Sequence, residues 1–578
     1  MHSPISVAYA CHNEDILDVI CLTPSGCTAT PVESEESSMR DVSDTRLKVR
    51  VSEPSDEPSR NGRSQEGPAT SSSDGSPQRQ TGRLRRAVGF ILAPVAAAVV
   101  WLAPLGIEPH QQSLGAVLAA VIILWFCESV PIPVGGLIGV AAIVLVGVAP
   151  ADEVLAPFGS TTIFTFIGAF ILAQAMLKHG VAQRLAYFVL SLPGVGTSTV
   201  RIIVAFGVIT ALLSALISNT ATVAMLLPTA LGILAVIAKM LEDKGIVKAG
   251  FDATRLRVGT ALMLMLAYGA GVGGLLTPVG APPNLIGRGL IEEATGERIS
   301  FASWIGAAAP VSIIMFGVLL LVLLLVNRPE VRRIEGVEAY IAEKRAEQGR
   351  ISRAEWNTII AFGLTVGLWL LPSVVGVIAG MNSAVYELLD VRLNEGIVAV
   401  IGASLLFLLP TRWRRGAATL AWSDAAKIDW GTIILFGTGM IFGTMLSSTG
   451  LAEAIGRGLF EGLGVASPFM ITVLAAGLAM LISETTSNTA SATVVVPIVL
   501  PLALAAGVDP VIPAMAATLG ASFGFMLPVA TPQNAIVYGS GCVPITKMVK
   551  SGIGMNILGG LVLVTVLPFT ASLMGIGG

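Results

Sequence analysis

Charge is scarce in this sequence, since Asp, Glu, Lys and Arg make up 13% of its 578 residues, against about 25% in soluble domains. There are four histidines, and no Cys-x-x-Cys pair links any of the five cysteines. No Walker loop or HExxH motif occurs, so we expect neither an enzyme nor a cofactor. The net charge of −3 and the lack of basic patches give no reason to expect nucleic acid as a partner.

Apolar side chains are abundant, at 53% of the chain with a mean hydropathy of +0.78. A membrane-spanning helix needs about 20 mostly apolar residues. The composition therefore predicts an all-α integral membrane protein. Eleven spans are expected, at about 87–105, 113–130, 132–150, 161–177, 259–277, 304–326, 357–377, 394–410, 431–449, 511–528 and 553–575. Two longer apolar runs, at about 201–237 and 467–506, are each interrupted by polar residues.

The first 82 residues differ from the rest of the chain, because they are rich in Ser, Pro, Asp and Glu and poor in aromatic residues. They carry 13 acidic and 7 basic side chains. Such a segment buries too little apolar area to offset the entropy of ordering it. We therefore predict a disordered acidic cytoplasmic tail at 1–82, followed by a membrane domain at 83–578.

Lys and Arg in the loops predict the orientation, because cytoplasmic loops carry an excess of them. If each interrupted run enters and leaves on one side of the membrane, 24 Lys and Arg residues fall inside. Only Arg288, Arg298, Arg392 and Arg457 then fall outside. A single crossing by either run would destroy this bias. Both runs are therefore predicted to be re-entrant hairpins, with the N-terminus in the cytoplasm and the C-terminus outside.

Two motifs occur twice, in the same order. "SNTA" at 218–221 recurs at 487–490. In each copy, another Ser precedes the Ser of the motif by four residues, and a Pro follows that Ser by ten residues. "PVGAPPN" at 278–284 likewise matches "PVATPQN" at 528–534. Each half has an odd number of crossings, so the repeats, at about 113–327 and 356–578, must be inverted. Inverted repeats are common in secondary transporters, whose sites lie near the midplane at the repeat interface.

The repeated residues suit ion and anion binding. Non-helical backbone at membrane depth must line a polar cavity, because lipid cannot satisfy its hydrogen bonds. A half-helix that begins at a hairpin tip offers free N–H groups to an anion. Ser, Asn and Thr cap such a helix and can donate to a carboxylate or sulfate, while turn carbonyls and side-chain oxygens can bind sodium. Prolines in the second motif break the helix there as well.

Glu484 stands beside the second polar tip. A carboxylate within the membrane is costly and therefore often functional. Two roles are open, since it could bind a cation or accept hydrogen bonds from backbone at the tip. We favour the second role.

The motifs resemble those of the divalent anion/sodium symporters, which include dicarboxylate, citrate and sulfate carriers. The resemblance rests on "ISNTATVAMLLP", "SETTSNTASATVVVP", "PVGAPPN" and "PVATPQN" and covers about residues 85–578. It implies eleven spans with two hairpins, a homodimer in the lipid bilayer, and an elevator movement of a transport domain.

The resemblance also implies site residues. One sodium ion would bind Ser214, Ser218, Asn219 and the backbone of Gly280. A second would bind Ser483, Asn488 and the backbone of Ala530. The dianionic substrate would contact residues of both repeats, namely Ser218, Asn219, Thr220, Ser487, Asn488, Thr489, Thr531 and Pro532. Sodium would act as a coupling ion rather than as a resident cofactor.

The sequence departs from the family at two positions. Ala281 stands where Thr is common, opposite Thr531, and Ser483 stands where Thr is common. The first change removes a hydroxyl donor from the expected pocket, whereas the second keeps its oxygen. No Lys, Arg or His occurs at either tip to replace a cation. The expected function is sodium-coupled import of small dianions such as succinate, malate or fumarate. The alternatives are a sulfate, oxyanion or tricarboxylate carrier, a sodium-independent dicarboxylate exchanger, and, more distantly, a membrane sensor or channel.

Overall fold

The computed structural model describes residues 77–248, 251–380, 383–412, 417–463 and 467–577, and residues 74–578 belong to one compact unit. The prediction of a disordered tail falls mostly outside the described residues. Helix α1 begins at Pro77, so residues 77–82 of the predicted tail are helical. The two cysteines in the described part, Cys127 and Cys542, are free.

Ten of the described helices are long and apolar enough to cross a membrane. They are α1 (Pro77–Leu102), α2 (Pro109–Phe126), α5 (Thr161–Lys178), α8 (Asn219–Asp243), α11 (Phe301–Val326), α13 (Arg353–Ala379), α17 (Trp430–Ser448), α19 (Pro468–Thr485), α20 (Asn488–Ala505) and α23 (Ile545–Leu573). The pair α14 (Ala384–Arg392) and α15 (Glu395–Leu408), bent by 58°, would make an eleventh if it is one span.

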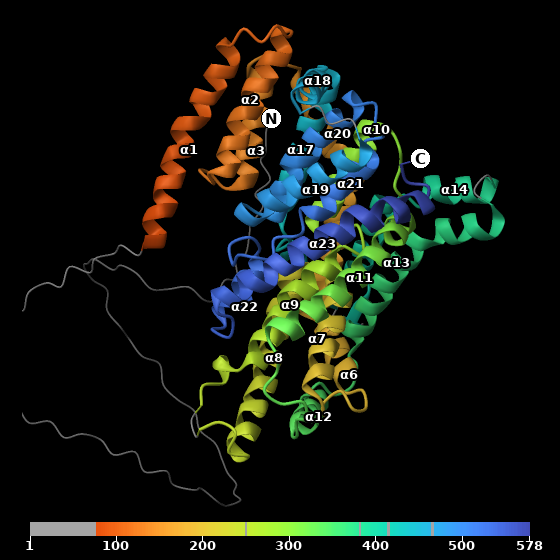
Figure 1. Cartoon of the computed structure of the whole chain (residues 1–578). Helices are drawn as coiled ribbons and strands as arrows, with labels where there is room; N and C mark the ends of the chain where they lie inside the picture. The colour runs from red at the N-terminus through yellow and green to blue at the C-terminus, as the bar shows by residue number, and fades with distance from the viewer. Residues whose placement is uncertain (1–76, 249–250, 381–382, 413–416, 464–466, 578) are drawn as a thin grey trace, which may run out of the picture. The chain divides into compact units, whose positions relative to one another are not determined.

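The remaining described elements are shorter or connect these helices (Figure 1). They are α3 (Ile132–Leu145), α4 (Ala151–Leu155), η1 (Ala156–Gly159), α6 (Val181–Leu190), α7 (Thr199–Ser214), η2 (Ala253–Arg255), α9 (Arg257–Gly274), α10 (Pro282–Thr295), α12 (Val337–Glu347), β1 (Pro410–Arg412), β2 (Ala417–Ala418), α16 (Trp422–Ala425), α18 (Leu451–Leu463), α21 (Val511–Gly520) and α22 (Pro532–Gly539). Strands β1 and β2 pair antiparallel.

The predicted spans differ from the helices in three places. The segment expected at 132–150 forms only the 14-residue α3. The segments expected at 259–277 and 511–528 are cut short, since α9 ends at Gly274 and α21 at Gly520. Irregular backbone follows each, and α10 and α22 then begin at the prolines of the second motif. The predicted helix breaks are therefore confirmed, whereas the boundaries of those two spans were too long.

Helices α7 and α8 are separated by a short break that contains Ser218. Both of their outer ends reach the segment that precedes α12. At the start of α7, Thr199 Oγ1 donates to the carbonyl of Val331 over 2.6 Å. Just beyond the end of α8, Lys244 Nζ lies 2.8 Å from Glu335 Oε1. The start of α7 and the end of α8 therefore lie close together, and Figure 1 shows both helices near α6 and α12.

Helices α19 and α20 repeat this arrangement around a break at residues 486–487. They are joined side by side, because Ser491 Oγ of α20 donates to the carbonyl of Ala479 of α19 over 2.7 Å.

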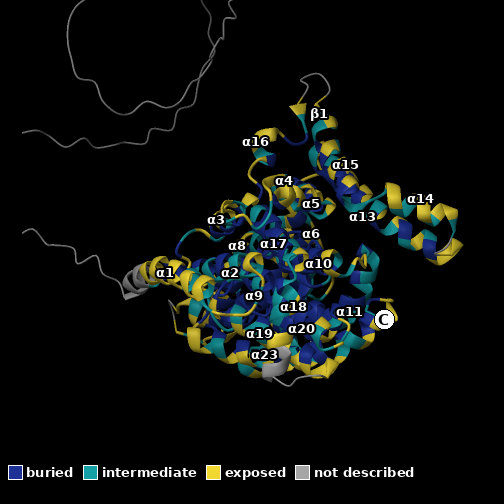
Figure 2. Cartoon of the chain, turned by 90° about the horizontal axis from the view of Figure 1, so that it is seen from above, coloured by how far each residue is buried: buried dark blue, intermediate teal, exposed yellow. Residues whose placement is uncertain are grey.

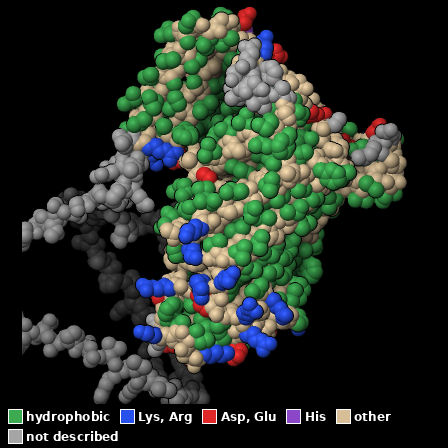
Figure 3. All heavy atoms as spheres, in the orientation of Figure 1, with side chains coloured by type: hydrophobic (Ala, Val, Ile, Leu, Met, Phe, Trp, Pro, Cys, Tyr) green, Lys and Arg blue, Asp and Glu red, His purple; other side chains and the backbone are tan. Residues whose placement is uncertain are grey.

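Helix α9 lies at the centre of the fold, and its residues from Val258 to Gly274 are all buried. The hydroxyl of Tyr268 donates to the carbonyls of Phe525 (2.7 Å) and Met548 (3.1 Å). These bonds link α9 to α23 and to the irregular segment between α21 and α22, residues 521–531; we call this segment and its counterpart at 275–281 the broken segments. In Figure 2, buried residues occupy the middle and exposed ones the periphery. Many of the exposed residues are apolar, such as Leu102, Val377 and Leu408, as expected for side chains that face lipid. Figure 3 shows this apolar surface, with Lys and Arg gathered near the end where α8 and α12 lie.

Candidate functional site

At each break between the paired helices, which we call a tip (residues 215–218 and 486–487), a serine caps the helix that follows. Ser218 Oγ accepts from the backbone N–H of Ala221 over 3.3 Å, and Ser487 Oγ accepts from that of Ala490 over 3.2 Å. Serine is favoured here because its short oxygen satisfies one of the N–H groups that a helix start leaves free. The following Asn and Thr therefore lie in the first turn, at the positive end of the helix dipole.

A second serine supports each tip from the preceding helix. Ser214 Oγ donates to Asn219 Oδ1, and Ser483 Oγ donates to Asn488 Oδ1 over 2.7 Å. Ser483 also lies 2.6 Å from the carbonyl oxygen of Ala521. All four side chains are buried. The same spacing of five residues thus produces the same cluster of neutral oxygens in both halves.

The broken segments are held open by the last Asn of each second motif. Asn284 Nδ2 donates to the carbonyls of Gly274 (2.7 Å) and Thr277 (2.8 Å). Asn534 Nδ2 donates to those of Gly524 (2.8 Å) and Leu527 (3.1 Å). The carbonyls of Gly274 and Gly524 lie where the helix that would satisfy them has ended, whereas those of Thr277 and Leu527 also accept from the backbone N–H groups of Gly280 and Ala530 over 3.3 Å.

Glycine allows the tips to approach the broken segments. A Cβ on Gly274 would lie 2.6 Å from Asn219 Oδ1, and a Cβ on Gly280 would lie 3.1 Å from the carbonyl oxygen of Ser214. In the second half, a Cβ on Gly524 would lie 2.9 Å from Asn488 Oδ1. The predicted sodium ligands Ser214, Asn219 and Gly280 are therefore gathered around one turn.

In each half, a side chain links the tip to the broken segment by hydrogen bonds, but the side chain differs between the halves. In the first half, Thr277 Oγ1 donates to the carbonyl of Ala215. In the second half, Glu484 takes the place of Ala215, and its Oε1 accepts from the N–H groups of Phe525 (2.8 Å) and Met526 (2.9 Å). Asn556 Nδ2 donates to the same oxygen over 2.6 Å. Glu484 therefore accepts hydrogen bonds from backbone, as favoured, but the donors belong to the irregular segment after α21 and not to the tip.

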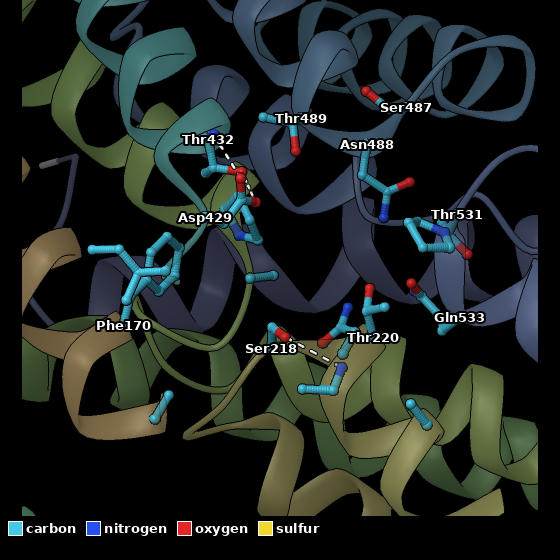
Figure 4. Close-up of a pocket in the computed structure, with 18 of the residues that line it drawn as sticks. Phe170, Ser218, Thr220, Asp429, Thr432, Ser487, Asn488, Thr489, Thr531 and Gln533 are labelled. Atoms are coloured by element: carbon cyan, nitrogen blue, oxygen red, sulfur yellow. Dashed lines mark hydrogen bonds between the residues drawn. The ribbon is translucent and has the colours of Figure 1, made fainter. Parts of the chain in front are cut away.

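A cavity of about 550 Å³ lies between the two tips. All eight predicted substrate contacts line it, namely Ser218, Asn219, Thr220, Ser487, Asn488, Thr489, Thr531 and Pro532. Figure 4 shows Ser218 and Thr220 on one side and Asn488 and Thr489 on the other, with Thr531 beside them. Of the predicted sodium ligands, Ser218, Asn219, Asn488 and Ala530 also line the cavity. Ser214, Gly280 and Ser483 are not among its lining residues and lie behind the tips.

Several lining residues were not predicted. Gln533 lies within the second motif itself, so its position could have been noticed there. Others come from α5 (Phe170 and Gln174), from the segment leading into α17 (Lys427 and Asp429) and from the first turn of α17 (Thr432). No local motif marks these residues, because only the packing of distant helices brings them to the cavity. Ala281 also lines the cavity, opposite Thr531 of the other half.

The lysine at the cavity is part of a small charge cluster. Asp424 Oδ2 lies 2.7 Å from Lys178 Nζ, and Asp424 Oδ1 lies 3.1 Å from Lys427 Nζ. The hydrogen bond from Lys178, and then that from Lys427, hold the pKa of the Asp424 carboxyl below its usual range. Asp429 is also engaged, because its Oδ2 accepts from Thr432 Oγ1 over 2.5 Å. The charges at this edge of the cavity therefore largely compensate one another.

The described residues contain no group of three or more His, Cys, Asp or Glu that could hold a metal ion. The tips instead offer neutral hydroxyl, amide and carbonyl oxygens. Such ligands suit a weakly held monovalent cation, while hydroxyl groups and two helix starts suit an anion. The arrangement can therefore hold both kinds of ion close together.

Several known proteins are similar to this chain. Residues 85–575 match the model of the sodium:sulfate symporter transmembrane region. The sodium-dependent dicarboxylate transporter SdcS of Staphylococcus saprophyticus is 32% identical over 83% of this chain and 91% of its own length. SdcS of Staphylococcus aureus is 30% identical over 85% of this chain and 91% of its own length. Among solved structures, the YdaH transporter of Alcanivorax borkumensis covers 84% of this chain and 98% of its own, with a TM-score of 0.48 and 14% identity.

Proposed function

This chain belongs to the sodium:sulfate symporter family, and on that premise we propose that it is a sodium-coupled symporter that imports small dianions. C4 dicarboxylates such as succinate, malate and fumarate are the proposed substrates. The observation that carries the proposal is the cavity between two tips of matching construction, lined by Ser218, Asn219, Ser487 and Asn488. The names of the relatives SdcS, sodium-dependent dicarboxylate transporters, support the choice of sodium and dicarboxylate.

We propose one sodium site per half. In the first, Ser214, Ser218, Asn219 and the Gly280 carbonyl would coordinate the ion. In the second, Ser483, Asn488 and the Ala530 carbonyl would do so. The short contacts between the serine hydroxyls and Asn219 Oδ1 or Asn488 Oδ1 support both assignments, because the oxygens are already gathered. A bound cation would then neutralise part of the substrate's charge, which explains how binding of the two ions could be coupled.

The substrate would lie between the tips, with its carboxylates at the starts of α8 and α20. There it would contact Ser218, Asn219 and Thr220 on one side, and Ser487, Asn488 and Thr489 on the other, with Thr531 and Pro532 beside them. The cavity of about 550 Å³ is ample for a four-carbon diacid. Each Asn would then contact a sodium ion through its oxygen and the substrate through its amide N–H.

The membrane arrangement is proposed in the same way. Helices α7 and α8 would form one re-entrant hairpin and α19 and α20 the other, within inverted repeats that move as an elevator in a homodimer. The contacts of Thr199 and Lys244 with one segment support the first hairpin. The gathering of Lys and Arg near α8 and α12 supports a cytoplasmic position for that end, with the N-terminus inside and the C-terminus outside the cell membrane.

Uptake of labelled succinate into proteoliposomes tests the proposed function. With an inward sodium gradient we expect saturable accumulation, and with choline in place of sodium we expect uptake to fall at least about tenfold, because the substrate's charges then lack their counter-ions. Unaltered uptake in choline would contradict sodium coupling. Flux that grows linearly with succinate concentration would indicate a channel, and bound succinate without flux would indicate a sensor.

A sodium-independent dicarboxylate exchanger is the second candidate. Lys427 favours it, since this side chain lines the cavity and could itself neutralise a substrate charge. Its ion pair with Asp424 weakens that role. Vesicles preloaded with unlabelled succinate distinguish the two functions, because an exchanger would take up labelled succinate in choline whereas a symporter would not.

The choice of dianion is expected to depend on Ala281. In the second half, Thr531 caps α22 by accepting from the N–H of Asn534 over 3.3 Å, whereas Ala281 gives α10 no side-chain cap. We expect Ala281→Thr to add a hydroxyl donor to the cavity and to lower the KM for one dianion about three- to tenfold, the effect of one hydrogen bond.

The measurement compares KM for succinate and for sulfate in the variant and the parent. Ala281→Val is the matched control, because Val has the branched shape of Thr without its hydroxyl. Equal effects of the Thr and Val substitutions would show that volume at this position matters and the hydroxyl does not.

A further inference from the structure

A second cavity, which we call the basic pocket, lies at one end of the helices. It has a volume of about 620 Å³ and is formed where α5 ends, α13 begins and strands β1 and β2 follow α15. Figure 2 shows β1, α15 and α13 near one another. Its described lining residues are Lys178, His179, Ser352, Arg353, Ala354, Thr411, Arg412, Ala417, Ala418 and Thr419. Three of them are cationic and none is acidic, so the pocket attracts anions.

Two of the three cations are free to bind a ligand. Lys178 is paired with Asp424. Arg353 and Arg412 are exposed, and neither guanidinium makes an ion pair or hydrogen bond with any described residue. Arginine is the side chain best suited to phosphate, because its planar fork can donate two parallel hydrogen bonds.

The start of α13 adds backbone donors to the same pocket. Ser352 Oγ accepts from the N–H of Glu355 over 3.2 Å, and Glu355 Oε2 accepts from the N–H of Ser352 over 2.5 Å. The N–H groups of Arg353 and Ala354, which both line the pocket, have no acceptor among the described residues. They stand at the positive end of a 27-residue helix dipole.

An apolar stripe leads away from the basic pocket. Arg353 is followed on the same face of α13 by Trp356, Ile360 and Leu364, which are 50%, 53% and 44% exposed. Leu408, at the end of α15, is 74% exposed. Because α13 is long and apolar enough to cross a membrane, this stripe faces acyl chains rather than water. A molecule that fits both features has an anionic head and a hydrocarbon tail.

We propose that the basic pocket binds the phosphate headgroup of an anionic phospholipid, with its acyl chains along the α13 stripe. Basic pockets between membrane helices on the cytoplasmic side are suited to such headgroups. The pocket adjoins the substrate cavity, since Leu177 lines the cavity and Lys178 lines the pocket. A bound headgroup would therefore hold the end of α5 beside the cavity. The proposal requires only that the chain lies in a membrane, and not that it transports dicarboxylates.

Thermal unfolding of the purified protein in neutral detergent tests the proposal. Added phosphatidylglycerol is expected to raise the melting temperature by about 3 °C or more, as a ligand that binds the folded state does. Phosphatidylcholine, which has no net charge, should leave it unchanged. The double variant Arg353→Gln with Arg412→Gln should lose the rise.

The matched control is Arg328→Gln with Arg333→Gln, which removes the same charge from exposed residues outside the basic pocket. An equal rise in the pocket variant would overturn the proposal, as would an equal rise with phosphatidylcholine. An equal rise with inorganic phosphate would show a site for free anions instead of a lipid. If the pocket variant does not fold, mass spectrometry of lipids retained by the wild-type protein decides. Preferential retention of phosphatidylglycerol over phosphatidylcholine supports the proposal, and equal retention overturns it.

Discussion

Substituting Asn219 or Asn488 by Ala is expected to lower the rate of sodium-driven succinate uptake at least about 100-fold, because each Asn would lose contacts to two ions, each worth about 1.5–3 kcal/mol. Asn219 Oδ1 is held by Ser214 and Asn488 Oδ1 by Ser483, and both side chains line the cavity. The amide must therefore serve the cation with its oxygen and the dianion with its N–H. Alanine can do neither.

The measurement is the initial rate of uptake into proteoliposomes, with reconstituted protein quantified in each sample. Gln183→Ala is a suitable control, because it also removes an amide, from an exposed position on α6 outside the substrate cavity. We expect this control to transport normally and all three variants to give a monodisperse peak in size-exclusion chromatography. Near-normal uptake by either Asn variant would contradict the assignment of both the sodium and the substrate sites.

The sequence predicted the centre of the site better than its edges. Ser, Asn and Pro at the tips and breaks act through local chemistry, since a Ser caps the helix that follows it and a Pro cannot continue one. The breaks between α7 and α8 and between α9 and α10 could therefore be placed from the residues alone. The doubling of both motifs then indicated that their side chains meet, and all eight predicted substrate contacts line one cavity.

The edges of the site depend on packing, which local patterns do not record. Phe170 and Gln174 reach the cavity because α5 passes beside it, and nothing in their neighbourhood in the sequence differs from an ordinary apolar helix. Lys427 lies between α16 and α17, and its neighbours in the sequence do not distinguish it from any other basic loop residue. Helix limits were also poorly predicted where apolar composition continues past the last helical residue, as after Leu145 and Gly520.

The asymmetry between the two halves leads to the second large expected effect. Glu484→Ala would leave the buried N–H of Phe525 and the partly buried N–H of Met526 without their acceptor, at a cost of up to about 1–3 kcal/mol each. These residues hold the broken segment against the tip that carries Ser483 and Asn488. We therefore expect the sodium concentration for half-maximal uptake to rise at least about tenfold. The KM for succinate, measured at saturating sodium, is expected to rise by a smaller factor.

The first half suggests how this loss can be repaired. There, an Ala already stands at the position equivalent to Glu484, and Thr277 bridges tip and segment by donating to its carbonyl. The residue equivalent to Thr277 is Leu527. The double variant Glu484→Ala with Leu527→Thr copies that bridge and should recover part of the sodium affinity, while Leu527→Val adds a similar shape without the donor and should not. If Glu484→Ala alone keeps the parent's sodium dependence and melting temperature, the carboxylate does not position the second sodium site. Equal behaviour of the Thr and Val double variants would instead show that the hydroxyl bridge of the first half cannot be transferred to the second.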